Sequence, residues 1–250
     1  MYYLDFFAQM HARLKPETYL EIGVAAGKSL RLSSCRSVGV DPGYAITVPI
    51  DGDIALMRTT SDEYFNRPDP LAPTDGRPFD MAFIDGLHLF EFALRDFINT
   101  ERHCAEQSLI VFDDMLPRTV DEAARQRHTR AWTGDVFPIL AVLAEYRPEL
   151  SVLAVDTHPT GLLLVMGLDP TSTVLSDHYD EIIARHRRPD PQDVPSSLLD
   201  RTTVLSPERV LASSFWDVQR ESRGGQGDFR EELNRALGET LGRAFVAAAR

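Results

Sequence analysis

The sequence predicts an α/β fold in which a mostly parallel sheet is covered by helices on both faces. Short, nearly continuous apolar runs alternate with helical patterns along residues 1–168, a rhythm typical of parallel strands that are buried on both sides. Several of these runs end in acidic residues. Because ligands bind beyond the carboxyl ends of the strands in such sheets, we expect the functional residues at that edge.

Composition places the chain among soluble globular proteins. It has 250 residues, enough to bury a full core, and 43% of them are hydrophobic. The formal net charge of −12 argues against binding to nucleic acid or to an anionic membrane surface. Cys35 and Cys104 form no paired framework, and residues 1–7 lack the basic start of a signal peptide. We therefore expect a cytoplasmic protein.

The elements expected are short apolar strands and amphipathic or capped helices. The strands lie at 18–24, 37–42, 54–59, 79–86, 108–114, 150–157 and 161–168. The helices lie at 2–14, 28–35, 61–65, 87–103, 135–147 and 228–249, with Ser61 as the cap of the third and Leu87 on the apolar face of the fourth. Only the short connection from His158 to Gly161 separates the last two strands, which favours their antiparallel pairing.

Residues 169–250 are expected to form a C-terminal extension to a domain of residues 1–168. They contain a polar, proline-rich linker at residues 185–201 and end in a long helix. The apolar stripe of that helix consists of Phe229, Leu233, Leu237, Leu241 and Phe245. Such a stripe must be covered, so we expect the helix to pack on the body of the chain or on the second subunit of a homodimer. The extension would then shape the substrate pocket or the dimer contacts.

The stretch GVAAGKS, which begins at Gly23, resembles the phosphate-binding loop of nucleotide hydrolases, but its spacing differs. Three residues separate Gly23 from Gly27, one fewer than a phosphate loop has at that place. Glu21 stands just before the loop, where a carboxylate would repel a triphosphate and would suit an ammonium group instead. The apolar strand ending in Asp113 and Asp114 supports the hydrolase alternative, because such strands hold magnesium in those enzymes.

Asp41 lies at the end of the second strand, twenty residues after Glu21. An acid at this place can accept two hydrogen bonds from a ribose diol, as it does in dinucleotide-binding folds. A nicotinamide-dependent oxidoreductase would share Asp41, but it prefers G-x-G-x-x-G, and this loop has no GxG. The simpler alternative is that Gly23 and Gly27 only shape a turn and that Asp41 caps a helix.

Several segments together resemble class I S-adenosylmethionine-dependent methyltransferases: E-x-G-x-x-x-G-x-S from Glu21, VGVDP, and TSDEYF from Thr60. FDMAFIDGLH and LIVFDD are similar to the metal-dependent O-methyltransferase branch, which includes catechol O-methyltransferase and the macrocin-type sugar O-methyltransferases. The resemblance covers residues 1–168. It implies a Rossmann-like, doubly wound sheet of seven strands with one antiparallel strand, in agreement with the strands expected from the apolar runs.

The resemblance also implies a site for S-adenosylmethionine. The residues it assigns to that site are Glu21, Gly23, Val24, Ala25, Gly27, Ser29, Asp41, Thr60, Ser61 and Asp85. The loop from Gly23 to Gly27 would back the methionine moiety, and Asp41 would bind the ribose hydroxyls. Thr60, Ser61 and Asp62 would lie beside the adenine.

Asp85, Asp113 and Asp114 end two strands that are neighbours in this fold. Three carboxylates there would repel one another unless a cation lies between them, and oxygen ligands suit magnesium better than zinc. In the family resembled, acids at these positions hold the metal. The alternative is that Asp113 caps the next segment while Asp114 faces water.

His88 lies three residues after Asp85 and is expected in the first turn of the following helix. Since catechol O-methyltransferase carries a basic lysine at this offset, the resemblance implies that His88 is the catalytic base beside Asp85. The alternative is a partly exposed helix-start residue paired with Glu91. The segment 117–135 should place Trp132 near the mouth of the site, with its arginines facing solvent.

The function expected is transfer of a methyl group from S-adenosylmethionine, with Mg²⁺ or another divalent cation, to a hydroxyl of a small molecule such as a natural-product sugar or a phenol. Alternatives from other classes are a non-catalytic S-adenosylmethionine-binding scaffold, a nucleotide hydrolase and a nicotinamide oxidoreductase. The N-terminal aromatic residues Tyr2, Tyr3 and Phe6 either close over the site or pack in the core.

Overall fold

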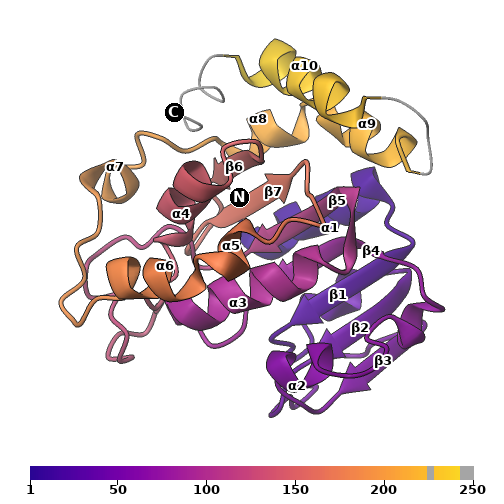
Figure 1. Ribbon diagram of the computed structural model, residues 1–250, viewed down its shortest axis with the longest axis horizontal. Helices are drawn as coiled ribbons and strands as arrows, with labels where there is room; N and C mark the ends of the chain where they lie inside the picture. The colour runs from indigo at the N-terminus through magenta and orange to yellow at the C-terminus, as the bar shows by residue number, and fades with distance from the viewer. Residues whose placement is uncertain (224–227, 243–250) are drawn as a thin grey trace.

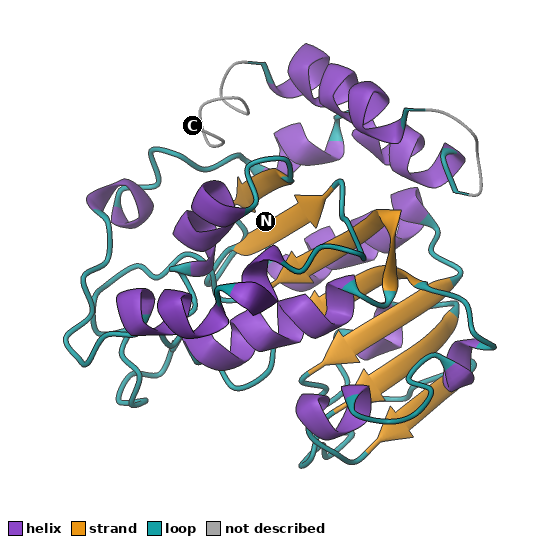
Figure 2. Cartoon of the chain, in the orientation of Figure 1, coloured by secondary structure: helices purple, strands orange, loops and turns teal. Residues whose placement is uncertain are grey.

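A computed structural model describes residues 1–223 and 228–242 and contains a seven-stranded sheet (Figure 1, Figure 2). Its strands are β1 (Thr18–Ile22), β2 (Arg36–Val40), β3 (Ile54–Met57), β4 (Phe79–Ile84), β5 (Cys104–Phe112), β6 (Ser151–Val155) and β7 (Leu162–Met166). Their order is β3-β2-β1-β4-β5-β7-β6, and β7 runs antiparallel to both neighbours while the other pairs are parallel. The predicted α/β fold with a late antiparallel strand is confirmed.

Helices flank this sheet. They are α1 (Tyr3–Leu14), α2 (Ser61–Phe65), α3 (Phe90–Glu101), α4 (Ile139–Tyr146), α5 (Val174–Asp177), α6 (Tyr179–His186), α7 (Ser196–Leu199), α8 (Pro207–Leu211), α9 (Phe215–Glu221) and α10 (Phe229–Leu241), with 3₁₀ turns η1 (Leu30–Leu32) and η2 (Ala72–Thr74). None of the helices in the described ranges is both long and apolar enough to cross a bilayer.

The sheet separates two apolar layers because successive strand residues point to opposite faces. On one face Leu20 and Ile22 of β1 pack in the same cluster as Phe97 of α3 and residues of α4 and α6. On the other face Tyr19 of β1 joins Phe7 of α1 and residues of α8, α9 and α10. Figure 1 shows α3 lying across the sheet and α8 to α10 grouped together at one side. The C-terminal extension therefore contributes to the same core as α1.

The helix expected at 28–35 is wrong, because only the single 3₁₀ turn Leu30–Leu32 forms there. Serine side chains of this segment bind elsewhere. The Ser29 hydroxyl donates to Glu21 at 2.7 Å, and the Ser33 hydroxyl lies 2.7 Å from a serine hydroxyl of β2. Such side-chain contacts compete with helix formation, so the chain turns at once toward β2.

Two helix starts also differ from expectation. α2 is capped by Thr60 rather than Ser61: the Thr60 hydroxyl accepts the N–H of Glu63, whose carboxylate accepts the N–H of Thr60 in a reciprocal capping box. α3 begins at Phe90, so Leu87 lies outside the helix and is 59% exposed. The expected apolar face of α3 therefore starts one turn later than its sequence pattern.

The C-terminal extension contains several short helices before its final helix. The end of α6 and the helix α7 lie in the expected linker at residues 185–201, and α5, α8 and α9 lie outside it. The expected packing of the final helix on the body is confirmed, because α10 packs on α9 and α9 on α1. Its stripe is buried at Phe229, Leu233, Leu237 and Leu241, whereas Phe245 lies outside the described residues.

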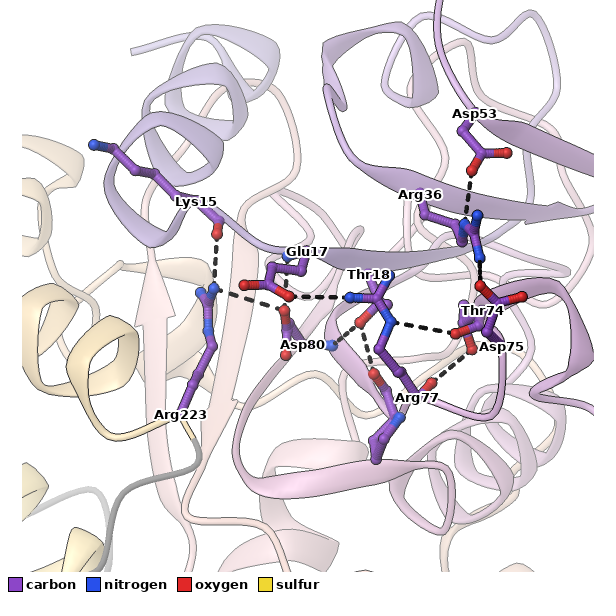
Figure 3. A network of polar contacts seen from close by, with 11 residues as sticks. Lys15, Glu17, Thr18, Arg36, Asp53, Thr74, Asp75, Arg77, Asp80 and Arg223 are labelled. Atoms are coloured by element: carbon purple, nitrogen blue, oxygen red, sulfur yellow. Dashed lines mark hydrogen bonds and ion pairs between the residues drawn. The ribbon is translucent and has the colours of Figure 1, made fainter.

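A polar network at the amino edge of the sheet ties the extension to the body (Figure 3). The Arg36 guanidinium bonds to Asp53 at 2.6 Å. Arg223, which follows α9, donates to the Lys15 carbonyl at 2.7 Å and lies 3.6 Å from Asp80 Oδ2. Because unpaired carbonyls end a helix, a cation at the end of α1 is electrostatically favourable as well.

Candidate active site

Acidic residues from two neighbouring strands meet at the carboxyl edge of the sheet. Asp85 follows β4, and Asp113 and Asp114 follow β5. The Asp113 N–H still donates to the Ile84 carbonyl at 3.1 Å, so the parallel pairing of β4 and β5 extends into the acidic residues. The structure thus brings together the three acids that the sequence places at strand ends.

His88 lies between two of these acids. Its Nδ1 is 2.7 Å from Asp114 Oδ2, and its Nε2 is 3.4 Å from Asp85 Oδ1. One ligand atom from each of Asp85, His88 and Asp114 lies within 4.8 Å of the other two. The Nδ1 contact does not follow the N–H direction of the ring, so this buried nitrogen has no aligned hydrogen-bond partner in residues 1–223 and 228–242.

His88 does not lie in the first turn of α3, as the sequence analysis expected. It precedes that helix, whose N-cap is Leu89, and has a φ of 56°. This left-handed conformation turns the chain sharply between β4 and α3. A Cβ on Gly134 would collide with the His88 carbonyl, so a glycine at that position allows the segment 132–135 to press against the turn.

Asp113 stands beside this group but is not one of the three clustered residues. Its Oδ1 accepts the N–H of Asp114 at 2.8 Å. Burial, followed by the charges of Asp114 and Asp85, raises the pKa of Asp113 well above its ordinary value. Its expected role as a metal ligand stays a prediction, and His88 takes the third place in the cluster.

The cluster carries more acidic groups than cations. Burial and the charge of Asp114 raise the pKa of Asp85 to about 6, although its hydrogen bond with His88 opposes the rise. Burial lowers the pKa of His88, but the contacts with Asp114 and Asp85 outweigh it and raise the value to about 11. A protonated His88 neutralises only part of the charge of three carboxyls, which leaves a setting that favours a bound cation.

The glycine loop from Gly23 to Gly27 lies against the end of β4. Gly23 has a φ of 91°, and a Cβ there would collide with the Asp85 carbonyl. Both conditions demand glycine. Val24 is buried and Ala25 is exposed, so the loop lies between the core and solvent.

Asp41 follows β2 and braces this loop. Its Oδ2 accepts the N–H of Ala25 at 2.7 Å, and its Oδ1 accepts the N–H of Gly43 at 2.6 Å. Each carboxylate oxygen has a further lone pair, so both can still accept hydrogen bonds from a diol. The geometry is compatible with the expected contact between Asp41 and a ribose, which stays a prediction.

Glu21 lies beneath the loop rather than on its surface. Its exposed fraction is 0%, and it accepts hydrogen bonds from Tyr19 Oη at 2.6 Å and from Ser29 Oγ at 2.7 Å. Burial raises the pKa of Glu21 to about 8, although the bonds from Tyr19 and Ser29 oppose the rise. Glu21 and Ser29 therefore support the base of the loop, and direct contact of either residue with a cofactor stays a prediction.

The residues expected beside the adenine lie at the start of α2. Thr60 is exposed, whereas Asp62 makes two hydrogen bonds of 2.6 Å with Arg95. Ser61 bonds to Asp96, a buried acid of α3 whose pKa burial raises to about 7. The sequence patterns did not single out Asp96, although its position as an acid within the amphipathic pattern of α3 was a signal that could have found it.

Trp132 covers His88, in agreement with its expected position near the mouth of the site. The two rings are stacked with centroids 4.9 Å apart and planes 7° apart, and the indole N–H donates to a backbone carbonyl of its own segment at 2.6 Å. Arg125 ties the same segment to α3 through an ion pair of 2.6 Å with Glu91. It also pairs with Asp135 at the end of the segment. Arg125 is thus an anchor and not a solvent-facing arginine, and Glu91 pairs with it instead of with His88.

The N-terminal helix carries the aromatic residues expected either to close over the site or to pack in the core. Burial, followed by the charges of Asp113 and Asp85, raises the pKa of Tyr3 far above its ordinary value. Phe6 is fully buried in the core, and Tyr2 is 45% exposed. A role of Tyr3 in covering the site stays a prediction.

Part of this chain is similar to known proteins. Residues 42–115 match a family described as a methyltransferase domain. None of the curated proteins matches the chain.

Similar solved structures include an O-methyltransferase of tomaymycin synthesis from Streptomyces achromogenes in complex with S-adenosylmethionine, at 15% identity, a TM-score of 0.46, and coverage of 66% of this chain and 79% of that one. An O-methyltransferase from Bacillus cereus with S-adenosylhomocysteine has 14% identity, a TM-score of 0.45, and coverage of 64% and 78%. A Podospora anserina methyltransferase with S-adenosylhomocysteine has 13% identity, a TM-score of 0.47, and coverage of 67% and 78%. Likenesses of this size carry no information on the substrate.

Proposed function

We propose that this chain, which has a class I fold and matches a methyltransferase-domain family over residues 42–115, transfers a methyl group from S-adenosylmethionine to a hydroxyl of a small molecule at a divalent cation. One observation carries the cation part: Asp85, His88 and Asp114 gather at the carboxyl edge of the sheet, against the glycine loop. This is the edge where sheets of this topology bind their ligands.

The donors in this cluster suit a divalent cation. Two carboxylates and an imidazole whose buried Nδ1 lacks an aligned partner offer oxygen and nitrogen ligands. Carboxylates suit Mg²⁺ and Mn²⁺, while imidazole widens the choice to other transition metals. When bound, such an ion lowers the pKa of a substrate hydroxyl and holds its oxygen in place. We assign Asp113 to positioning Asp114 through their hydrogen bond.

The cofactor would lie along the glycine loop. Gly23 and Gly27 leave the backbone free to approach the methionine moiety, and Asp41 keeps lone pairs for the ribose hydroxyls. Glu21 acts from below by holding Ser29, whose hydroxyl donates to it. The stripe of α10 is buried within this chain, so we do not assign it to a homodimer.

The reaction is an in-line displacement in which alignment of the partners is the main task. The hydroxyl oxygen attacks the methyl carbon, the carbon–sulfur bond breaks, and the hydroxyl proton leaves; the products are a methyl ether and S-adenosylhomocysteine. His88 can accept that proton only as a neutral imidazole that is not bound to the ion, so it serves either as a ligand or as the base. Its pairing with Asp114 and Asp85 keeps it protonated, so the base role requires that this pairing be released.

Methyl-transfer assays with labelled S-adenosylmethionine test the proposal. Catechol and simple sugars serve as acceptors, with Mg²⁺ or Mn²⁺ present or removed by EDTA. We expect S-adenosylhomocysteine to raise the melting temperature, and label transfer to stop in EDTA and return with the metal. Full activity in EDTA would remove the cation from the proposal, and stabilisation by ATP or NAD but not by S-adenosylhomocysteine would overturn methyl transfer itself.

A further inference from the structure

A pocket of about 530 Å³ lies between α4, the edge strand β6 and the segment that follows α6. It shares no lining residue with the acidic cluster. Its volume falls in the range of small-molecule sites. One wall consists of apolar residues of α4 and β6, among them Leu140, Ala144 and Val152, and the facing wall includes the end of α6.

The α4 wall is apolar although it is open. Val142 and Leu143 of α4 are buried in the core, yet Ala141 and Ala144 on its outer side are exposed and line the pocket. A surface helix normally presents polar residues to solvent. The apolar outer side of α4 therefore indicates a surface that a ligand covers.

The facing wall is cationic, in contrast to the net charge of −12 for the whole chain. Arg185 and Arg188 both line the pocket, with one acid, Asp193, at the same wall. Arg185 pairs with Glu145. Arg188 forms no ion pair with a carboxylate of the described ranges, so its charge is available to a ligand.

His186 is one of the polar residues that line the pocket. Its Nε2 is buried and has no hydrogen-bond partner within the described part of the chain. Burial and the charge of Arg185, with a smaller effect of Arg188, lower the pKa of His186 against the opposing charge of Glu145. The ring is therefore neutral at neutral pH, and the potential around it is positive. A buried nitrogen without a partner is unfavourable unless a ligand or water bonds to it.

We propose that this pocket binds a small amphipathic anion. Its apolar body would lie on α4 and β6, and its anionic group would pair with Arg188 at the open side. This site is separate from methyl transfer, and its occupation does not depend on the proposed reaction.

The probe is 8-anilinonaphthalene-1-sulfonate, a compact aromatic anion whose fluorescence rises in apolar sites. It is titrated into the full chain saturated with S-adenosylhomocysteine. Ala144→Trp should fill the pocket and abolish binding, and Arg188→Ala should weaken it about tenfold. The matched controls are Ala184→Trp on the exposed side of α6 and Arg102→Ala at the end of α3, which do not line the pocket and should leave affinity within about twofold.

Competition identifies the ligand chemistry. Octanoate should displace the probe, whereas octanol of the same chain length should displace it poorly. Unchanged binding in Ala144→Trp, checked by normal melting and repeated with Ala141→Trp, would overturn the pocket as the site. Equal displacement by octanol would overturn the anionic part. Stronger binding after removal of residues 243–250 would identify the chain's own C-terminal segment as the occupant and overturn the proposal.

Discussion

The acidic residues at the two edges of the same sheet differ in their burial and in their pairing with cations. At the amino edge the acids are paired with arginines: Asp53 lies 2.6 Å from Arg36, which also pairs with Asp75, and Glu17 lies 3.0 Å from Arg77 (Figure 3). Asp53 and Glu17 are well exposed, with side-chain exposures of 66% and 70%. Solvated pairs of this kind hold chain segments together and stabilise the fold only slightly.

At the carboxyl edge Asp85 and Asp114 share the imidazole of His88, and Asp113 lies beside them. Asp85, Asp113 and Asp114 are more buried than their counterparts at the amino edge, and His88 is the cation that lies among them. Burial and the neighbouring acids raise the pKa values of Asp85 and Asp113, and such arrangements are common at functional sites. The comparison separates acids that are paired with arginines, which hold chain segments together, from the less fully paired acids of the proposed site.

The largest effect should come from a clustered acid. Asp114→Ala removes one of the three donors and should lower methyl transfer by about 100-fold or more, because the charge that holds the cation is lost. The shift of melting temperature by S-adenosylhomocysteine should persist. The matched control is Asp53→Ala at the amino edge, which should retain activity. Equal activity of the two variants would erase the contrast between the edges.

A second prediction concerns the pH dependence of stability. Burial raises the pKa of Glu21 from 4.5 to about 8, so the folded state keeps a proton that the unfolded chain releases in this window. The free energy of unfolding should therefore fall as pH rises from about 4.5 to about 8, with a slope of up to ~1.4 kcal/mol per pH unit from this residue.

Glu21→Gln should remove that contribution. Urea unfolding of the wild type and the variant would be compared across the same pH window, with Glu17→Gln at the amino edge as the exposed control. A difference in stability between wild type and Glu21→Gln that stays constant with pH would contradict the buried-acid account.

A smaller effect is expected from the residue that covers the cluster. Trp132→Leu removes the ring stacked on His88 and should lower kcat about tenfold, since a loosely held His88 leaves the donors less well placed. Binding of S-adenosylhomocysteine should be preserved. Steady-state kinetics with the acceptor found in the assays checks this, and an unchanged kcat would show that the stacking serves only packing.

The smallest effect should come from the amino edge. Arg36→Ala breaks the exposed pairs with Asp53 and Asp75, and the melting temperature should fall by about 2 °C or less. Methyl transfer should not change. Thermal melting at low and high salt measures the effect, and a large loss of stability or activity would refute the division between the two edges.

Much of the fold was predictable because the signals are local. Short apolar runs mark the strands, and the position of Asp85, Asp113 and Asp114 after two of them predicts their meeting once the sheet is parallel. The cap of α2 was also readable, since Thr60 and Glu63 have the spacing of a capping box.

The remaining features depend on contacts across the chain. Ser29 does not lie in the expected helix, because its hydroxyl donates to the buried carboxyl of Glu21, eight residues earlier in the sequence. His88 adopts a left-handed turn that is pressed by Gly134 and flanked by acids from two strands. The short helices α8 and α9 of the extension form against α1 and the sheet, because tertiary packing stabilises helices that are too short to form alone.

The central claim is that the carboxyl-edge acids hold a cation. A titration with Mn²⁺ followed by electron paramagnetic resonance tests it most directly, because the sharp signal of free Mn²⁺ is lost on binding. The account predicts about one bound equivalent in the wild type, none in an Asp85→Asn, Asp114→Asn variant, and wild-type binding in an Asp53→Asn, Asp75→Asn control. Undiminished binding in the Asp85→Asn, Asp114→Asn variant would contradict it.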